Sequence, residues 1–351
     1  MESCFRHFVA GRFIEPIFHC VDPYLKDAHH AWKDMDTITI EERSDPSYTL
    51  SYTGTLLGSN TIAAGNVQDW AVIQGAAGTM LFIDGQHQST LEDEYIYHET
   101  FVHRLMWRLP SRKRVLILGG AEGCLAREVM RWHDVEDVVQ VDWDKSLVDF
   151  FRETEQHVWN NGAYEDRRIS VVHADASAWL RDYAGEPFDA IFIDLLDPAS
   201  AEECNFLTTI LKQCKIHLSP QGGLSCNIGP VVPSKRTFGT YVAEVFHTEF
   251  AAPYFSRAIT KAFVPSYLGE WCFCMATPHA YRLGHKVPPL PSGTRRDCKE
   301  YVYREPTWTS DYPLILQKFH LYTEEEAAAL QKLTVAPPLH ITKDLNEYYG
   351  C

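Results

Sequence analysis

A glycine-rich turn at residues 119–123 could bring a ligand directly against the backbone, because glycine has no side chain to hold a ligand away. An apolar run, Val115 to Leu118, precedes the turn, and a helical apolar pattern follows it. Asp142 ends the next apolar run, about where an acid that holds ribose hydroxyls belongs. The turn and this acid together predict a site for a nucleoside-type ligand.

An acidic side chain, Glu122, lies inside this turn. Dinucleotides place phosphates at such a turn, and S-adenosylmethionine places a carboxylate there, so Glu122 would repel either anion at short range. A nucleoside with a cationic tail would be attracted instead. Decarboxylated S-adenosylmethionine, which carries a sulfonium and an aminopropyl amine, is one such molecule. The alternative is that Glu122 faces solvent as a first-turn acid favoured by the helix dipole.

Two further acids, Asp175 and Asp194, stand at or just after the ends of predicted strands, as Asp142 does. In a parallel sheet flanked by helices, ligands bind beyond the carboxyl ends of the strands. We therefore expect these carboxylates to share one edge of the sheet with the glycine turn. The alternative reading is a helix N-cap, which applies more to Asp175 than to Asp194.

Alternating strand and helix patterns position these acids. The predicted strands are 114–118, 138–142, 169–173, 188–194 and 224–227, and the predicted helices are 146–159, one from 177, 206–217 and 235–250. Two late strands, 258–263 and 271–276, return to the same sheet. This order predicts an α/β fold with a doubly wound, mostly parallel sheet and helices on both faces.

The residues before this unit predict a small antiparallel sheet. Short β-rich runs at 48–52, 70–73 and 80–83 alternate with turn residues, and Asp84-Gly85 forms a turn before a polar, aromatic stretch that leads into a helix. The predicted division is an N-terminal extension at 1–45, a small β-sheet domain at 46–110, a catalytic domain at 111–285 and a peripheral segment at 286–351. Within that last segment, residues 323–326 form a capping box that opens a short helix to Leu333.

The net charge of −15 over 351 residues argues against a nucleic-acid partner and favours cationic ligands such as polyamines. No apolar run reaches the length of a membrane span, and the first residues show no signal-peptide pattern. We expect a cytoplasmic protein without a membrane partner.

The cysteines and histidines do not predict a metal site. The 10 cysteines are scattered without a Cys-x-x-Cys pair, which is typical of buried thiols in a reducing compartment. His98 and His103 are five residues apart, so they lie on different faces of a helix instead of the same face. We expect no metal ion.

The ordered motifs from Gln68 to Pro278 resemble the polyamine aminopropyltransferases of the spermidine synthase family. The matching segments are Asp84-Gly-x-x-Gln88, Asp93-Glu94, Tyr97-His98-Glu99, Gly119-Gly-Ala-Glu-Gly123 and Asp194-Leu-Leu-Asp-Pro198. The resemblance implies a Rossmann-like, methyltransferase-type fold. It also implies decarboxylated S-adenosylmethionine as co-substrate, no prosthetic group, a polyamine acceptor and a homodimer or homotetramer.

The resemblance also implies roles for single residues. The nucleoside and its tail would contact Gln68, Gln88, Gly119 and Glu122, Asp142 would hold ribose hydroxyls, and Asp175 would contact adenine. Asp194 would act on the attacking nitrogen, with Asp197 and Tyr97 as further catalytic groups. The acceptor pocket would comprise Tyr97, His98, Asp197, Tyr267 and Trp271.

Within the family, the chain resembles the thermospermine synthases most. The similar segments are the Glu-bearing turn, Asp194-Leu-Leu-Asp-Pro198, Asn227-Ile-Gly-Pro230 and Val264-Pro-Ser-Tyr267. We expect conversion of spermidine to thermospermine. Spermidine or spermine synthesis and aminopropyl transfer to agmatine are alternatives, since the Glu-bearing turn is shared with enzymes acting on other amines.

The chain departs from the family pattern at two places. Ala121 replaces the middle glycine, and the segment after Pro198 is reduced to Ala199–Cys204. Two other functional classes therefore stay open: a methyltransferase that uses S-adenosylmethionine, and a non-catalytic protein that binds polyamines or nucleosides. Glu122 argues against the methyltransferase, and the retention of both Asp194 and Asp197 argues against the non-catalytic binder.

Overall fold

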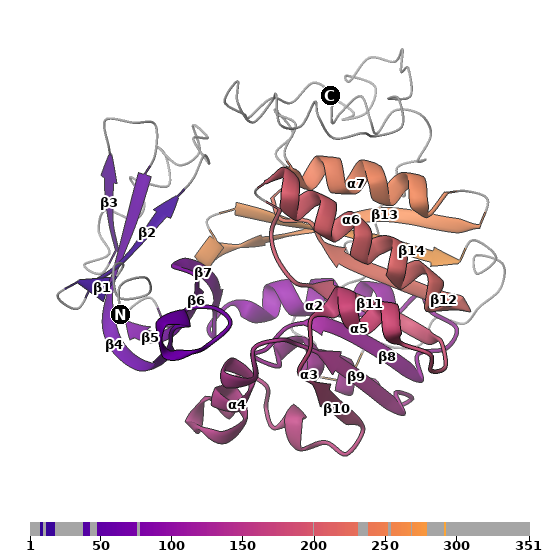
Figure 1. The fold of residues 1–351 in the computed structure, drawn as a ribbon, viewed down its shortest axis with the longest axis horizontal. Coiled ribbons are helices and arrows are strands. Elements are labelled where there is room, and N and C mark those ends of the chain that lie inside the picture. Colours follow the sequence, from indigo (N-terminus) through magenta and orange to yellow (C-terminus); the bar gives the residue numbers. More distant parts are fainter. Residues whose placement is uncertain are drawn as a thin grey trace, which may run out of the picture.

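The structure, a computed structural model, describes residues 8–9, 12–17, 38–42, 48–75, 78–198, 200–230, 238–251, 254–267, 269–278 and 291–292. The helix predicted at 323–333 and almost all of the segment 286–351 lie outside these residues. Two seven-stranded sheets form the framework (Figure 1).

The first sheet is antiparallel. Its strands are β1 (Phe8–Val9), β2 (Arg12–Ile17), β3 (Ile38–Glu42), β4 (Tyr48–Asn60), β5 (Trp70–Gly75), β6 (Gly78–Ile83) and β7 (Gln86–Thr90). Their order is β1-β2-β4-β5-β6-β7, and β3 pairs with β4. The sheet thus extends into residues 1–45, where the sequence pattern indicated only an extension. A turn at Asp84 and Gly85, both with positive φ, joins β6 to β7.

The second sheet confirms the predicted doubly wound α/β fold. Its order is β10-β9-β8-β11-β12-β14-β13, in which the first five strands are parallel and the last two are antiparallel. The strands are β8 (Arg114–Gly119), β9 (Asp137–Val141), β10 (Ile169–Val172), β11 (Phe188–Asp194), β12 (Leu218–Asn227), β13 (Phe255–Val264) and β14 (Gly269–Pro278).

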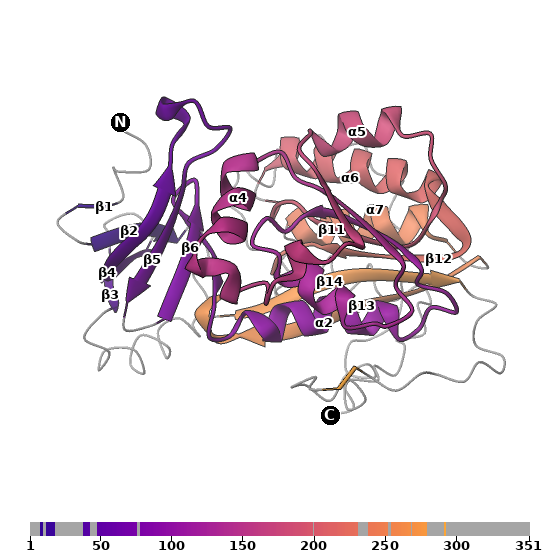
Figure 2. The ribbon, with the colours of Figure 1, turned by 90° about the horizontal axis from the view of Figure 1, so that it is seen from below.

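Helices cover both faces of this sheet, as Figure 2 shows. They are α2 (Glu94–Met106), α3 (Cys124–Met130), α4 (Lys145–Glu153), α5 (Ala176–Asp182), α6 (Ala201–Ile216) and α7 (Phe238–Glu249). Along β8, Val115 and Ile117 belong to the core beneath α2 and α3, whereas Leu116 and Leu118 belong to the core beneath α5, α6 and α7. This alternation buries an apolar strand on both faces.

A third apolar cluster joins the small sheet to α4. Trp70 and Leu81 from the small sheet pack with Leu147 and Phe151 from α4. Ser146 reinforces the junction, because its hydroxyl oxygen accepts a hydrogen bond of 2.8 Å from the indole nitrogen of Trp70. The small sheet is thereby held beside the carboxyl ends of the parallel strands.

Candidate active site

One cleft of about 710 Å³ lies between the small sheet and the carboxyl ends of β8, β9 and β11. All the side chains predicted from the sequence to form the site line this cleft. They are Gln68, Gln88, Tyr97, His98, Gly119, Glu122, Asp142, Asp175, Asp194, Asp197, Tyr267 and Trp271. They come from both sheets, from α2 and from the connecting segments, so the cleft exists only where the two sheets meet.

The glycine turn lets β8 pass closely beside β11. Gly119, Gly120 and Gly123 have φ values of +85°, +70° and +80°, which L side chains rarely adopt. A Cβ atom on Gly119 would lie 1.9 Å from the carbonyl oxygen of Asp194. Ala121, which replaces a family glycine, is not among the residues with positive φ, so its side chain is accommodated without this strain.

We expect Gly119→Ala to lower the free energy of unfolding by about 2–4 kcal/mol, because it combines a positive φ with overpacking against β11. Gly120→Ala is the matched control, since its Cβ would find its nearest neighbours only at 3.7 Å. That variant should cost about 1–2 kcal/mol, the penalty of the left-handed backbone alone. Urea unfolding measures both changes, and equal losses would contradict the role given to Gly119.

Asp142 and Asp175, which the resemblance assigns to the nucleoside, both line the cleft. Asp142 is buried, and its Oδ1 accepts a hydrogen bond of 2.9 Å from the backbone nitrogen of Asp144. Burial raises the pKa of Asp142 to about 7, partly offset by that hydrogen bond. Asp175 is exposed and caps α5, because its Oδ1 accepts from the backbone nitrogen of Ala178 at 2.7 Å. The N-cap reading therefore holds for one oxygen of Asp175, while the residue also lines the cleft.

Asp194 lies at the floor of the cleft and accepts a hydrogen bond of 2.6 Å from the hydroxyl of Tyr97. Burial raises the pKa of Asp194 to about 7, and the charge of Glu122 adds to this rise. The positive charge of His98 and the hydrogen bond from Tyr97 act against it. Burial and the charge of Asp194 also raise the pKa of Tyr97 far above its usual value, so the phenol stays protonated and donates.

Asp197 marks the other end of the cleft. Its Oδ1 accepts hydrogen bonds from the side-chain amide of Asn227 at 2.8 Å and from the indole nitrogen of Trp271 at 3.1 Å. Tyr267 donates its hydroxyl to the carbonyl oxygen of Gln88, and its ring lies 4.7 Å from that of Trp271, centroid to centroid. Carboxylates and aromatic faces together suit a chain of methylenes and ammonium groups.

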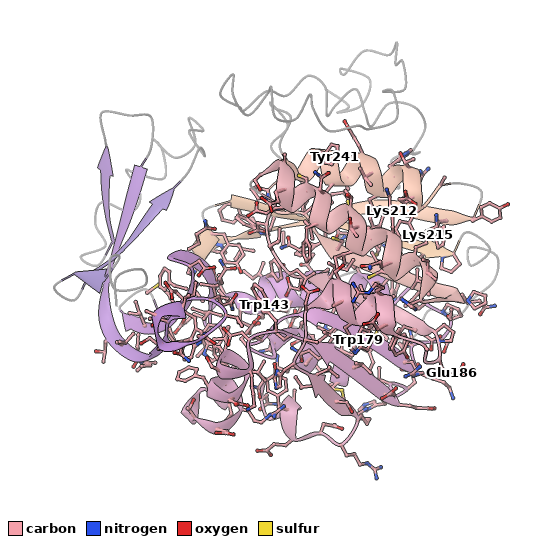
Figure 3. All side chains as sticks on the ribbon, viewed as in Figure 1. Trp143, Trp179, Glu186, Lys212, Lys215 and Tyr241 are labelled. Atoms are coloured by element: carbon pink, nitrogen blue, oxygen red, sulfur yellow. The ribbon has the colours of Figure 1, made fainter. Side chains whose placement is uncertain are left out.

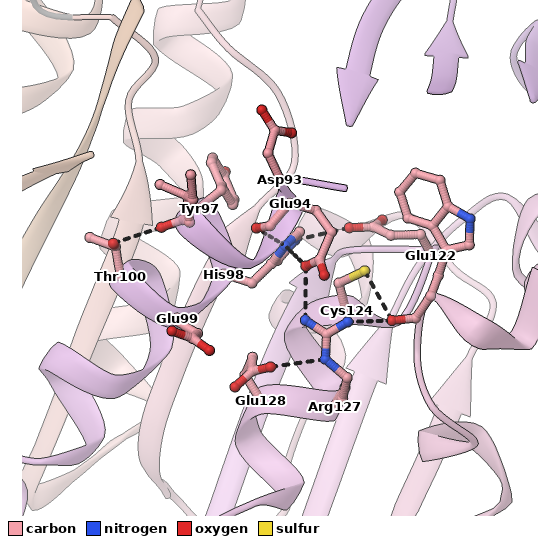
Figure 4. Close-up of polar contacts among 12 residues, drawn as sticks. Asp93, Glu94, Tyr97, His98, Glu99, Thr100, Glu122, Cys124, Arg127 and Glu128 are labelled. Carbon is pink, nitrogen blue, oxygen red and sulfur yellow. Dashed lines mark hydrogen bonds and ion pairs between the residues drawn. The ribbon is translucent and has the colours of Figure 1, made fainter. Parts of the chain in front are cut away.

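His98 differs from the other residues that the resemblance assigns to the acceptor. Its side chain is 1% exposed, Nδ1 lies 2.9 Å from Glu94 Oε2, and Nε2 lies 3.0 Å from Glu122 Oε1 (Figure 4). Burial alone would lower the pKa of His98, but the hydrogen bonds and charges of the two glutamates raise it to about 10. Glu122 is likewise buried and paired, so it does not face solvent as a first-turn acid.

The same histidine belongs to two groups of ligand-type atoms that lie within 4.8 Å of one another. One group is Glu94, His98 and Cys124, and the other is His98, Glu122 and Asp194. A metal ion binds neutral imidazole, whereas the flanking carboxylates favour the protonated ring. In the first group Glu94 is also ion-paired with Arg127 at 2.8 Å. The donor set therefore suits an ammonium ion better than a metal ion.

Among the residues lining the cleft that sequence reasoning missed, three make or extend the polar contacts of the site. Trp143 is 52% exposed and lies between the two sheets (Figure 3), where its indole nitrogen donates to Gln68 Oε1 at 3.3 Å. Its position directly after Asp142 was the available signal. Asn227 positions Asp197, and Glu202 stands in the first turn of α6. Glu202 was hidden because the segment after Pro198 looked like a shortened loop.

That segment is the start of α6. Ser200 caps the helix, since its hydroxyl oxygen accepts a hydrogen bond of 3.2 Å from the backbone nitrogen of Glu203. The helix begins at Ala201 instead of the predicted residue 206. Its first turn lines the cleft, as Asp197 does.

Comparison with known proteins gives a consistent result. Residues 94–282 match the sequence profile of the spermine/spermidine synthase domain. A polyamine aminopropyltransferase of Synechococcus sp. (strain JA-2-3B'a(2-13)) is 38% identical over 212 residues, 58% of this chain. One from Sulfolobus acidocaldarius is 32% identical over 202 residues, 57% of this chain. In both cases the match spans 65% of the relative's own length.

Solved structures share the fold. Spermidine synthase from Thermotoga maritima aligns with a TM-score of 0.56 at 18% identity, covering 90% of this chain and 95% of its own. A spermidine synthase in complex with the transition state analogue AdoDATO aligns with a TM-score of 0.58 at 18% identity, covering 90% and 96%. Within the described residues, no helix has the length and apolar character needed to span a bilayer.

Proposed function

The chain belongs to the spermine/spermidine synthase family, and from this premise we propose that it transfers an aminopropyl group from decarboxylated S-adenosylmethionine to a polyamine, releasing methylthioadenosine. One observation carries the proposal: carboxylates occupy the part of the cleft between the glycine turn and Tyr97. Glu122 and Asp194 lie there together, where S-adenosylmethionine would have to place its own carboxylate.

The reaction needs positioning more than covalent catalysis, because the sulfonium already provides a good leaving group. The attacking nitrogen must be neutral and aligned behind the methylene that is bonded to sulfur. A carbon–nitrogen bond forms, the carbon–sulfur bond breaks, and its electron pair stays on sulfur as a neutral sulfide. The proton lost from the amine passes to Asp194 and then to water.

Asp194 suits this role because its pKa is raised to about 7 by burial and by Glu122. An unperturbed aspartate would be a weaker base, and a general base is most effective when its pKa lies near the working pH. The hydrogen bond from Tyr97 fixes the orientation of the carboxylate. Asp197, Tyr267 and Trp271 then hold the remaining ammonium groups and methylenes of the acceptor.

The test is to incubate the purified protein with decarboxylated S-adenosylmethionine and a panel of amines, and to identify the products by mass. Formation of methylthioadenosine together with an aminopropylated amine supports the proposal. Methylated products with S-adenosylmethionine would favour the methyltransferase alternative, and binding without turnover would favour the non-catalytic binder.

For the acceptor we propose spermidine, converted to thermospermine. The support is the resemblance of residues 119–123, 194–198 and 264–267 to the thermospermine type. A triamine also needs an acidic contact beyond Asp197, and Glu202 lines the cleft at that end.

We expect Glu202→Gln to raise KM for spermidine by roughly 5-fold with little change for putrescine, since one exposed ion pair contributes at most about 1 kcal/mol. Glu186→Gln is the matched control, because this exposed glutamate precedes β11 at the far end of the sheet (Figure 3). Competition between equal putrescine and spermidine, with chromatographic separation of thermospermine from spermine, measures the preference. Prior consumption of putrescine, or spermine as product, would refute the acceptor assignment.

A further inference from the structure

A buried chain of alternating charges runs from the glycine turn into the space between α2 and α3 (Figure 4). Glu122 contacts His98 at 3.0 Å, and His98 contacts Glu94 at 2.9 Å. Glu94 contacts Arg127 at 2.8 Å, and Arg127 contacts Glu128 at 2.9 Å. Glu122 and His98 line the cleft, whereas Glu94, Arg127 and Glu128 lie behind them.

His98 and His103 lie on the same helix but have opposite hydrogen-bonding environments. Both ring nitrogens of His98 face carboxylate oxygens, which only accept, so both must carry a proton. In His103, Nε2 faces Glu128 at 2.9 Å, but Nδ1 accepts a hydrogen bond of 3.1 Å from the indole of Trp132. His103 thus has one carboxylate and one donor as partners, whereas His98 lies between two carboxylates and is an imidazolium.

The two carboxylates beside the reacting centre are not equivalent. Ligand-type atoms of His98, Glu122 and Asp194 all lie within 4.8 Å of one another. Glu122 receives a charged donor, the imidazolium, whereas Asp194 receives a neutral donor, the hydroxyl of Tyr97. A charged donor stabilises the ionised carboxylate roughly twice as strongly as a neutral donor does. The proton is therefore directed away from Glu122.

We propose that His98 is a positioning residue that divides the roles of these two carboxylates: it pairs with Glu122, which is thereby reserved for the donor's ammonium, and leaves Asp194 to accept the proton from the attacking amine. This inference rests on the function proposed above and deepens it. It requires that neither ring nitrogen of His98 contacts the acceptor, in contrast to the direct contact that the family resemblance implies.

The charges that face this centre come from every element around it. Helix α2 contributes Glu94 and Tyr97, the turn contributes Glu122, and α3 contributes Cys124 and Arg127. Asp142 follows β9, Asp194 and Asp197 lie at and after the end of β11, and Tyr267 precedes β14. Within this set the imidazolium is the cation nearest to Asp194, and its charge lowers the pKa of that carboxyl. Removing the positive charge of His98 must therefore raise the pKa of Asp194.

The decisive variant is His98→Gln, which keeps an amide donor for Glu122 but removes the positive charge. We expect the acidic limb of the pH–rate profile to move up by about 1 unit, so that kcat below the limb falls about 10-fold while kcat at high pH changes little. His103→Gln is the matched control, since it replaces a buried histidine of the same helix that does not line the cleft. It should lower the melting temperature without moving the limb.

Two outcomes would overturn the proposal while leaving the function intact. One is transfer by His98→Gln with an unmoved acidic limb, even at a uniformly lower rate, because that is the mark of a purely structural role. The other is a neutral His98 ring at pH 8 in nitrogen-15 spectra of the histidine-labelled protein without substrate. The signal is assigned among 16 histidines by its loss in His98→Gln. Absence of transfer by the unmodified protein overturns both the function and this inference.

Discussion

Replacing Asp194 by asparagine is expected to lower kcat by about 10²–10⁴-fold, the usual contribution of a general base, while leaving the fold and nucleoside binding intact. Asparagine keeps the size of the side chain and can still accept a hydrogen bond from Tyr97, whose hydroxyl lies 2.6 Å from Asp194 Oδ1 in the unmodified protein. It cannot take a proton from the attacking amine. Steady-state kinetics of methylthioadenosine release, with calorimetry for nucleoside binding, measure the two effects separately.

The pH dependence gives this prediction a second readout. Because the pKa of Asp194 is raised to about 7, its base form appears as pH rises through that value, and the rate of the unmodified protein should rise with it. In Asp194→Asn this limb should disappear, leaving only the deprotonation of the amine. An asparagine variant with full activity would remove Asp194 from the mechanism.

Asp189→Asn provides the matched control on the same strand. Asp189 lies near the opposite end of β11, where its Oδ2 accepts hydrogen bonds from the hydroxyl of Ser111 at 2.6 Å and the backbone nitrogen of Lys113 at 2.8 Å. Its loss should reduce stability by about 1–3 kcal/mol, because Ser111 and Lys113 lose a charged hydrogen-bond acceptor. It should leave kcat unchanged, which separates the chemistry of Asp194 from a general weakening of the sheet.

The central sheet was predictable because its strands are buried on both faces and therefore read as apolar runs. Their ends located Asp142 and Asp194 correctly at one edge of the sheet. The start of β12 was not predictable in this way: Leu218 pairs with Phe188, and the register then shifts before Ala190 pairs with Gly223. Such an irregularity depends on the partner strand, and the glycines within it read locally as a turn.

The small sheet and the start of α6 show two other reasons for failure. The strands β1 to β3 are short and follow no clear alternation, so their assignment depends on pairing: β2 and β3 pair with β4, which is distant in the sequence for β2, and β1 pairs with β2. Ser200 with the following glutamates is an N-cap pattern that was present in the sequence. It was overlooked because comparison with the family motif made these residues look like a loop.

The site itself was predictable as a set of residues but not as a set of contacts. Glu94 and His98 are four residues apart, the spacing that places side chains together on a helix face. Nothing local indicates that Glu122 meets the other side of the same ring, because this depends on how α2 packs against the turn. The sequence argument therefore treated Glu122 as an unpaired anion, whereas the structure pairs it with an imidazolium.

The pairing matters for the expected preference between the two nucleosides. Eight carboxylates line the cleft, among them those of Glu122, Asp142, Asp194 and Asp197, and they outnumber the imidazolium of His98, so the cleft remains negative at pH 8. We expect decarboxylated S-adenosylmethionine to bind on the order of 10²-fold more tightly than S-adenosylmethionine. Two unit charges about 5 Å apart at an effective dielectric constant of 20 repel by about 3 kcal/mol.

Glu122→Gln should narrow this ratio to roughly 10-fold, because the nearest repelling charge is gone while Asp194 and Asp142 remain. Glu128→Gln is the matched control: Glu128 is also buried and also paired with a histidine, but it lies at the end of the charge chain away from the cleft. Calorimetry with both nucleosides gives the ratio of their affinities within each variant, so a loss of stability common to both glutamine variants does not affect that ratio.

Equal affinity of the unmodified protein for the two nucleosides would remove the electrostatic argument for aminopropyl transfer. An unchanged ratio in Glu122→Gln would instead assign the discrimination to Asp194 and Asp142, the carboxylates that flank the turn.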